Sequence, residues 1–480
     1  MSLARSAIRS VAGYGIINVF VYTLSFIVQI VLANLLTPDI FGAVALAVAI
    51  TTFATLVLRW GIPQAIMQED EELEDRFSTV FWINVGGTSA LTLLVLVALP
   101  LLFTFFQQRV VQVLLLVFSA TALRNLALPF RAAIQREFDL PRLAIIQLIS
   151  LIISAVIGIG LALNGVGVWS LAIYYALRDV LSGIGHLVYS PRYPDFTFDW
   201  GTAIWFYSFA TGMIGSRVLI SVESEGDDFI VGSVLGTASL GLYSFGWRLA
   251  TAFHSVVHPA INKGIIPTFA KLKESPNESR QAIEFLVRME LGVAIPGYVF
   301  AALTAPTVIL AIFGPQWSGM IPVFQTLCLS GILFPTLAVA RQIYYTWGKP
   351  RRVLRIQIVY ITALLIAFAV LLPIYDVIGA AIAVNISLSI GCLLLFNELR
   401  KDVGISLAKI FGLRLGAGAI CLSIGYLTRD PVREVINLDS LMVVSMGVIV
   451  ALSFYIPLVI FDRKGMKEDF SKISRAFLES

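Results

Sequence analysis

Long apolar segments dominate this chain, and fourteen of them follow one another between residue 11 and residue 461. A hydrocarbon core about 30 Å thick takes roughly 20 apolar residues to cross as a helix. Each segment approaches or exceeds that length, so the sequence predicts fourteen transmembrane helices. In chain order, the predicted spans are 11–35, 38–59, 77–104, 109–131, 143–163, 166–189, 203–222, 229–257, 282–312, 319–346, 353–373, 377–398, 406–427 and 438–461.

Positive charge alternates between the loops that join these segments. Lys and Arg collect at the N-terminus, in every second loop and in the C-terminal tail, whereas the other loops hold only Arg109, Arg429 and Arg433. Cytoplasmic loops of membrane proteins carry an excess of Lys and Arg. Both termini are therefore predicted to be cytoplasmic, in a multi-pass protein of the cytoplasmic (inner) membrane.

Composition excludes several classes of protein. With 58% hydrophobic and 13% charged residues, a water-soluble domain would expose too much apolar surface. The net charge of +4 follows from the basic loops, so no nucleic-acid partner is expected. Cys328, Cys392 and Cys421 are widely spaced within apolar segments, which fits neither a disulfide framework nor a zinc site. His254 and His258 have helical spacing but no nearby carboxylate, so no metal is expected.

A repeated segment indicates two related halves. The stretch 31–42, which includes Leu36-Thr-Pro-Asp-Ile-Phe-Gly42, resembles 230–241, with an offset of 199 residues. Repeats of six helices, an even number, have the same orientation in the membrane, as in transporters whose two lobes rock around a central site. The predicted fold is all-α, with two six-helix lobes around a cavity. The predicted domains are an N-lobe (1–200), a C-lobe (201–402), two further helices (403–461) and a cytoplasmic tail (462–480).

Polar side chains recur at i, i+4, i+7 and i+11 on three predicted helices, which confines each set to an arc of about 60°. Such residues commonly hydrogen-bond between packed membrane helices, but stripes from both lobes also predict a shared hydrated cavity. The stripe residues assigned to the cavity are Asn18, Tyr22, Ser25, Gln29, Tyr175, Ser182, Ser244 and Thr251.

Arginine outnumbers acid inside the predicted spans. A charge at the centre of a membrane helix costs about 2.5–3.5 kcal/mol unless it is hydrated or paired. Arg suits phosphate because its planar guanidinium donates two parallel hydrogen bonds and stays charged. Asp179 is the predicted ion-coupling carboxylate, and the segment 223–228 is read as an acidic turn between two spans. The predicted anion-binding residues are Arg248, Arg178, Arg124, Arg341, Arg217 and, at the cytoplasmic mouth, Arg59.

Several loop segments together resemble Wzx-type polysaccharide and O-antigen flippases, the polysaccharide transporter family of the multidrug/oligosaccharidyl-lipid/polysaccharide exporter superfamily. Arg248 lies where that family often has an Arg. The segments that carry the resemblance are Leu36-Thr-Pro-Asp-Ile-Phe-Gly42, Gly61-Ile-Pro-Gln-Ala-Ile66, Phe77-Ser-Thr-Val-Phe-Trp82, Ala133-Ile-Gln-Arg-Glu-Phe138, Gly165-Val-Gly-Val-Trp169, Leu235-Gly-Thr-Ala-Ser-Leu-Gly-Leu-Tyr243, Ile266-Pro-Thr-Phe269 and Phe313-Gly-Pro-Gln-Trp317.

The resemblance implies fourteen helices in two lobes and the export of lipid-linked sugars for cell-surface polysaccharide such as lipopolysaccharide or exopolysaccharide. The expected substrate is a polyprenyl-(pyro)phosphate-linked oligosaccharide, moved by alternating access. The expected driving force is an ion gradient of H⁺ or Na⁺, with no cofactor, and other polysaccharide assembly proteins are possible partners. Two alternatives stay open: a cation-coupled multidrug exporter, and a membrane-embedded glycan polymerase or ligase, which would need larger outer loops than the predicted ones.

Overall fold

The computed structural model describes residues 3–56, 61–67, 73–435 and 439–461. All elements in this part are helices, and eleven of the described helices are long and apolar enough to cross a membrane. The protein is therefore an integral membrane protein that crosses the bilayer several times. The fourteen crossings and the lobe boundaries stay predictions, and the predicted tail lies outside the described residues.

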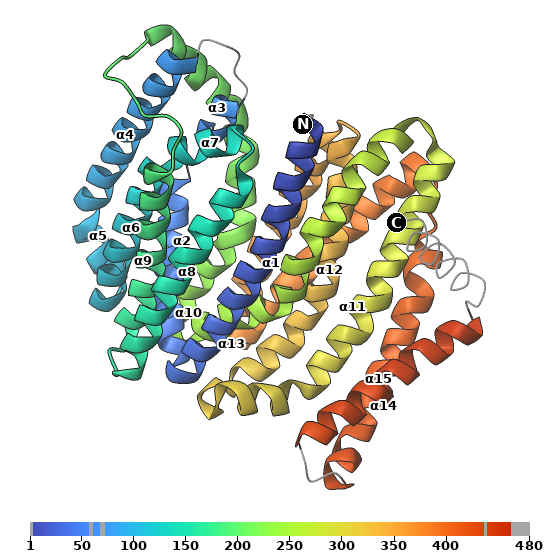
Figure 1. The fold of residues 1–480 in the computed structure, drawn as a ribbon. Helices are drawn as coiled ribbons and strands as arrows, with labels where there is room; N and C mark the ends of the chain where they lie inside the picture. Colours follow the sequence, from blue (N-terminus) through green and yellow to red (C-terminus); the bar gives the residue numbers. More distant parts are fainter. Residues whose placement is uncertain (1–2, 57–60, 68–72, 436–438, 462–480) are drawn as a thin grey trace. The chain divides into compact units, whose positions relative to one another are not determined.

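The chain divides into two compact units, whose boundary in the sequence lies between Ser244 and Phe245. The first unit contains α1 (Leu3–Leu35), α2 (Pro38–Thr55), α3 (Ile62–Met67), α4 (Leu73–Val97), α5 (Leu99–Phe105), α6 (Gln108–Leu126), α7 (Leu128–Arg136), α8 (Leu140–Leu163) and α9 (Val168–Val188). The helix α10 (Trp200–Lys271) begins in the first unit and ends in the second (Figure 1). The second unit continues with η1 (Leu272–Glu274), α11 (Pro276–Phe313), η2 (Pro315–Trp317), α12 (Met320–Thr346), α13 (Pro350–Val403), the π-helical turn η3 (Ala408–Gly412), α14 (Leu413–Val435) and α15 (Asp439–Phe461).

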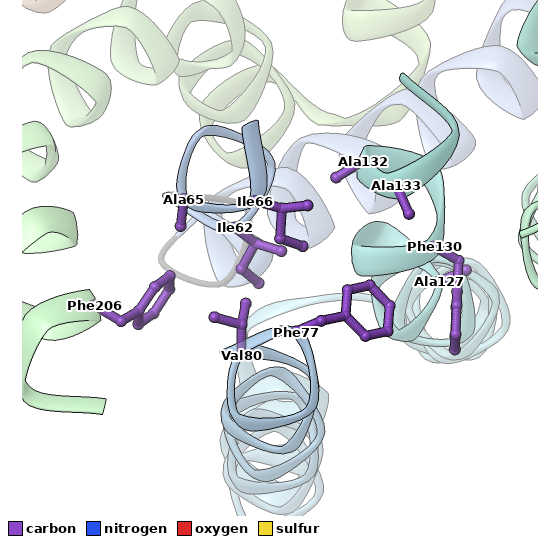
Figure 2. Close-up of a cluster of buried hydrophobic side chains, with 10 residues drawn as sticks. All are labelled: Ile62, Ala65, Ile66, Phe77, Val80, Ala127, Phe130, Ala132, Ala133 and Phe206. Atoms are coloured by element: carbon purple, nitrogen blue, oxygen red, sulfur yellow. The ribbon is translucent and has the colours of Figure 1, made fainter. Parts of the chain in front are cut away.

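In the first unit, α8 packs against α1 and α9, and α6 packs against α2 and α9. The short helices α3 and α7 pack against each other, and a buried apolar cluster joins them to α4 and to the start of α10 (Figure 2). This cluster contains Ile62, Ala65, Ile66, Phe77, Val80, Ala127, Phe130, Ala132, Ala133 and Phe206. Burial of these side chains stabilises the position of α7 directly after α6.

The break between α6 and α7 is held by a hydrogen bond from another helix. Pro129 in the first turn of α7 has no N–H, so the carbonyl of Asn125, four residues earlier, loses its helical donor. The Asn84 side chain of α4 donates to that carbonyl at 2.8 Å. Within a membrane such a bond matters, because no water replaces the missing donor.

Two prolines in α11 repeat this arrangement in the second unit. Pro296 leaves the carbonyl of Gly292 without a helical donor, and the Tyr455 hydroxyl of α15 donates to it at 3.0 Å. The next proline along α11, Pro306, leaves the carbonyl of Ala302 without a helical donor, and the Gln325 side-chain amide of α12 donates to it at 2.8 Å. At each proline, a side chain of a neighbouring helix is thus hydrogen-bonded to the backbone of α11.

The second unit is built around α11, which packs against α12, α14 and α15, while α12 packs along α13. The helix α13 contains a non-helical residue, Asp376 (φ 52°, ψ −138°), between the predicted spans 353–373 and 377–398. The chain therefore changes direction where a boundary between two spans was predicted.

The corresponding turn in α10 corrects the sequence prediction. The chain leaves helical geometry at Gly236 (φ 85°, ψ 178°), inside the segment predicted as the span 229–257. The acidic segment 223–228, predicted to be a turn, is instead helical. Its Asp227 is buried and accepts a hydrogen bond from the Tyr243 hydroxyl at 2.6 Å. This bond joins the segments before and after the turn at Gly236. Hydropathy alone placed the break at the charges, whereas the glycine makes the turn.

The two repeated segments contact each other at their glycines. A Cβ on Gly42 would lie 1.7 Å from the carbonyl oxygen of Thr237, and a Cβ on Gly241 would lie 1.8 Å from that of Pro38. Gly42 and Gly241 are equivalent in the repeat, as are Pro38 and Thr237, so the contact is symmetrical. The symmetry supports the internal repeat, and the spacing explains why both positions lack a side chain.

The connection from α9 to α10 is fixed to α4. The amide of Asp199 donates to the Thr79 hydroxyl at 2.9 Å, and that of Asp195 donates to the Ser78 hydroxyl at 2.9 Å. The Asp199 carboxylate caps α10 by accepting from the amide of Thr202 at 2.6 Å. This bond lowers the pKa of Asp199 below its usual value, because it stabilises the ionised form.

Candidate functional site

The first unit contains a cavity of about 500 Å³ lined by α1, α6, α7, α8 and α9, together with Pro63 of α3. Polar side chains make up most of its wall. They are Tyr14, Asn18, Tyr22, Ser25, Arg124, Asn125, Arg131, Gln147, Ser150, Arg178, Asp179, Ser182 and His186.

Seven residues predicted from the sequence lie on this one cavity. Three come from the stripe on α1, one from α6 and three from α9, whose polar residues recur at helical spacing. They are Asn18, Tyr22, Ser25, Arg124, Arg178, Asp179 and Ser182. Because α8 packs between α1 and α9, the stripes of α1 and α9 line the same space.

Arg124 and Asp179 form an ion pair across the contact between α6 and α9. Arg124 Nη1 lies 2.8 Å from Asp179 Oδ1, and the Thr121 hydroxyl donates to Oδ2 at 2.9 Å. The close approach depends on Gly183 of α9, where a Cβ would lie 3.3 Å from the Cα of Arg124. Asp179 therefore neutralises one cavity arginine and fixes its orientation.

Arg178 is held by aromatic rings. Its guanidinium carbon lies 5.7 Å from the ring centroid of Tyr174 and 5.3 Å from that of Tyr175, both on α9. Cation–π contacts of this length are attractive, more so where water is excluded. Tyr175, which was predicted to line the cavity, instead lies beneath a residue that does.

Three further residues present polar atoms that accept or donate no hydrogen bond within the described part of the chain. They are the buried Nε2 of His186, Nε of Arg131 and the side-chain amide of Asn125. His186 is 3% exposed and Asn125 is fully buried, and all three residues line the cavity. Buried polar groups normally have a partner, so these atoms mark a place for water or a bound ligand.

The cavity wall carries excess positive charge. Arg124, Arg131 and Arg178 line it against one acid, Asp179, so two guanidinium charges have no carboxylate counterpart on the wall. At about 2.5–3.5 kcal/mol for each central Arg, such an arrangement is costly unless water or an anion enters. The cavity is chemically suited to an anionic group with several acceptor oxygens.

Other predicted residues lie elsewhere. Arg248, Thr251 and Arg341 belong to the second unit, where Arg341 donates to the Tyr360 hydroxyl at 3.2 Å and Thr251 bonds to its own helix. Ser244 is buried in the first unit and does not line the cavity; neither does Gln29. Arg59 and the side chain of Arg217 lie outside the described residues.

The sequence interpretation missed several cavity residues. Arg131 was counted among the basic loop residues, although α7 carries it into the cavity wall. His186 belongs to the same helical stripe in the sequence as Asp179 and Ser182, but it was not among the residues assigned to the cavity, whose wall it lines. Gln147 and Ser150 share one face of α8 at a spacing of three residues. Tyr14 lies four residues before Asn18, so an extension of the α1 stripe could have identified it, whereas nothing in the sequence marks Asn125.

The fold and the charged cavity define a class of protein: multi-pass membrane proteins built like known transporters. Two solved structures resemble this chain. The lipid II flippase MurJ, in an inward closed conformation, matches with a TM-score of 0.77 over 94% of this chain and 99% of its own, at 15% identity. An inward-facing MATE-family multidrug resistance transporter of the MOP superfamily matches with a TM-score of 0.60 over 80% and 95%, at 15% identity.

The sequence identifies the family within that class. Residues 31–322 match the model of the family described as "Polysaccharide biosynthesis protein", so the chain belongs to this family. ExoT, the succinoglycan biosynthesis transport protein of Rhizobium meliloti, is 27% identical over 69% of this chain and 68% of its own. TuaB, a teichuronic acid biosynthesis protein of Bacillus subtilis, is 26% identical over 68% of each. AglR, a probable flippase of Haloferax volcanii, is 26% identical over 78% and 80%. The resemblance to polysaccharide transporters drawn from the loop segments is confirmed.

Proposed function

We propose that this protein is a flippase that moves a polyprenyl-(pyro)phosphate-linked oligosaccharide from the cytoplasmic to the outer leaflet of the inner membrane. The single observation that carries the proposal is the basic cavity of the first unit, with Arg124, Arg131 and Arg178 against one acid. Family membership and the flippase named among the relatives support the same function.

In the proposed mechanism, the phosphate groups bind near Arg131, Arg178 and His186. Arg124 is already bound to Asp179, so it contributes less to holding the anion than Arg131 and Arg178, which have no carboxylate counterpart on the cavity wall. The donors of Asn125 and His186 supply hydrogen bonds to phosphate oxygens, which accept several each. The hydroxyl and amide groups of α1 and α8 face the sugars.

Translocation would follow alternating access. The lipid tail stays in the bilayer while the two predicted six-helix lobes rock around the bound headgroup. The termini are cytoplasmic in this arrangement, and an ion gradient biases the cycle. The protein is a transporter in this account and makes or breaks no covalent bond in the substrate.

The test is export of the host's own surface polysaccharide, in the source strain with the chromosomal gene replaced by variants. Arg178→Ala and Arg131→Ala are each expected to lower export at least tenfold at equal membrane abundance, equivalent to about 1.4 kcal/mol of binding. Arg142→Ala is the matched control, because Arg142 forms an exposed ion pair with Asp139 outside the cavity wall. Normal export by both cavity variants would contradict the proposal.

The main alternative, export of cationic drugs, fits the cavity poorly. A cationic substrate would need carboxylates, and the lining contains one acid, already paired. A rise in tolerance to several organic cations when the protein is expressed in a host lacking drug pumps would favour that alternative.

A further inference from the structure

The second unit contains an acid with no cationic partner among the described residues. Glu290 lies on α11, within a helix long and apolar enough to cross the membrane. Its Oε1 lies 3.0 Å from the Thr336 hydroxyl of α12, which also lies 2.8 Å from the carbonyl of Ile332 in its own helix and shares its one proton between these two acceptors. Its Oε2 is buried and has no donor within the described part of the chain.

In the part of the chain that the structure describes, the neighbouring helices supply titratable groups but no cation bound to the carboxyl. Tyr298 of α11 and Cys392 of α13 both lie close enough to Glu290 to interact with its charge. Cys392 is also within range of Arg341 of α12, whose Nη1 is bonded to Tyr360.

The two C-terminal helices approach α11 close by. Arg414 of α14 donates to the carbonyl of Arg288, and Tyr455 of α15 donates to that of Gly292. Those donors thus meet the backbone on either side of Glu290 rather than its carboxyl.

A bare carboxylate is expensive in this environment, because one hydroxyl cannot replace its hydration. The carboxyl is stable if a proton or a metal cation occupies the free oxygen. Ca²⁺ and Mg²⁺ require several oxygen ligands, usually including carboxylates, whereas the described residues include no group of three or more acids, Cys and His that could hold a metal ion. A proton needs only Oε2 itself.

We propose that Glu290 is a reversible proton-binding site of the second unit, separate from the basic cavity of the first. The step is proton transfer alone: an O–H bond forms at Oε2 when a proton arrives from water, and the same bond breaks when it leaves. The Thr336 hydroxyl stays beside Oε1 and so orients the carboxyl. Thr336 directly follows Pro335, which has no N–H and so leaves α12 one helical hydrogen bond short at this point.

If the proposed function holds, this site gives the flippase a means of coupling to a proton gradient. Charge on Glu290 would appear and disappear between α11 and α12, and conformations that admit water to Oε2 would be favoured when the proton leaves. The proton-binding site itself does not depend on what the first unit transports.

Infrared difference spectroscopy on the purified full-length protein tests the site directly. The wild type is expected to show the carbonyl-stretch band of a protonated carboxyl that disappears as pH is raised. Glu290→Gln should lack this band, and Thr336→Val should keep it at a shifted frequency because the hydrogen bond to Oε1 is lost. Glu284→Gln is the matched control: Glu284 lies on the same helix but is paired with Arg280 at 3.4 Å and Lys409 at 3.7 Å, so the band should remain.

A band that persists unchanged in folded Glu290→Gln, or no pH-sensitive carboxyl band in the wild type, would overturn the proposal. Coupling has its own readout. In cells that export glycan, collapse of the proton gradient with an ionophore should slow wild-type export several-fold. The rate of export by Glu290→Gln should be the same with and without the ionophore. Absence of any export by the wild type would refute the proposed function without affecting the infrared result.

Discussion

Adding a single methyl group at the glycine contact between the repeated segments should destabilise the first unit. In Gly42→Ala the new Cβ would lie 1.7 Å from the carbonyl oxygen of Thr237, and real Cβ contacts are essentially never below 3.0 Å. The obstructing atom is backbone, so no side-chain rotation relieves the clash. The start of α2 and the segment after Gly236 must therefore separate by more than 1 Å.

The cost follows from the nature of the displacement. Overpacking a well-packed interior by one methyl typically costs 1–3 kcal/mol, and a clash with backbone belongs at the upper end, about 3 kcal/mol. For a unit of this size that corresponds to a fall in Tm of roughly 6–12 °C. Gly241→Ala should behave alike, because its Cβ would lie 1.8 Å from the carbonyl oxygen of Pro38.

The assay is thermal unfolding of the full-length protein in one detergent. Gly86→Ala is the control, since a Cβ on this helical glycine meets nothing within 4 Å, and it should melt at or slightly above the wild type. The double variant of Gly42 and Gly241 should lose less than the sum of the single losses, because either methyl opens the same contact. If Gly42→Ala melted together with Gly86→Ala, the reasoning from this contact would be refuted.

Three further outcomes are expected from thermal unfolding. Asp179→Ala and Arg124→Ala should each lower the free energy of unfolding by about 1–3 kcal/mol, because each change leaves a partly buried charge without its partner. The double variant should lose less than the sum of the two single losses. Additive losses would show that the pair is not coupled. Gln325→Leu should cost about 1–3 kcal/mol by leaving the carbonyl of Ala302 without a donor, and an unchanged Tm would contradict this role. The pKa of Asp199 is lowered in the folded protein, so its ionised carboxylate stabilises the fold at neutral pH and this stabilisation is lost as acid protonates the carboxyl. The difference in Tm between Asp199→Ala and the wild type should therefore be largest at neutral pH and vanish in acid. A difference that does not change with pH would exclude the charged cap.

Much of the fold could be predicted because the membrane imposes simple lengths and periods. Apolar segments of about 20 residues identified the helices, and the repeat identified Gly42 and Gly241 as equivalent positions. Their contact could not be predicted, since equivalence in sequence does not specify which repeated elements touch. The turn at Gly236 was misplaced because hydropathy falls at the charges of 223–228, while the backbone turns at the glycine.

Helical periodicity predicted the site residues that share one face of one helix, but not the contacts between helices. The stripe on α9 identified Asp179 and Ser182, which share one face of one helix. The partner of Asp179 comes from α6, and depth in the membrane does not reveal that Arg124 is its counterion. Arg131 was hidden for a different reason: it follows the break between α6 and α7, where sequence alone suggests the start of a loop.

The central claim, that the basic cavity holds the phosphate of a lipid-linked glycan, is tested most directly by mass spectrometry of lipid that purifies with the protein. The wild type should carry a polyprenyl glycolipid containing phosphate, and the double variant Arg131→Ala/Arg178→Ala should lose most of it while Arg142→Ala retains it. Equal amounts of the glycolipid on the wild type and the double variant, or none on the wild type in a strain that accumulates it, would contradict the account.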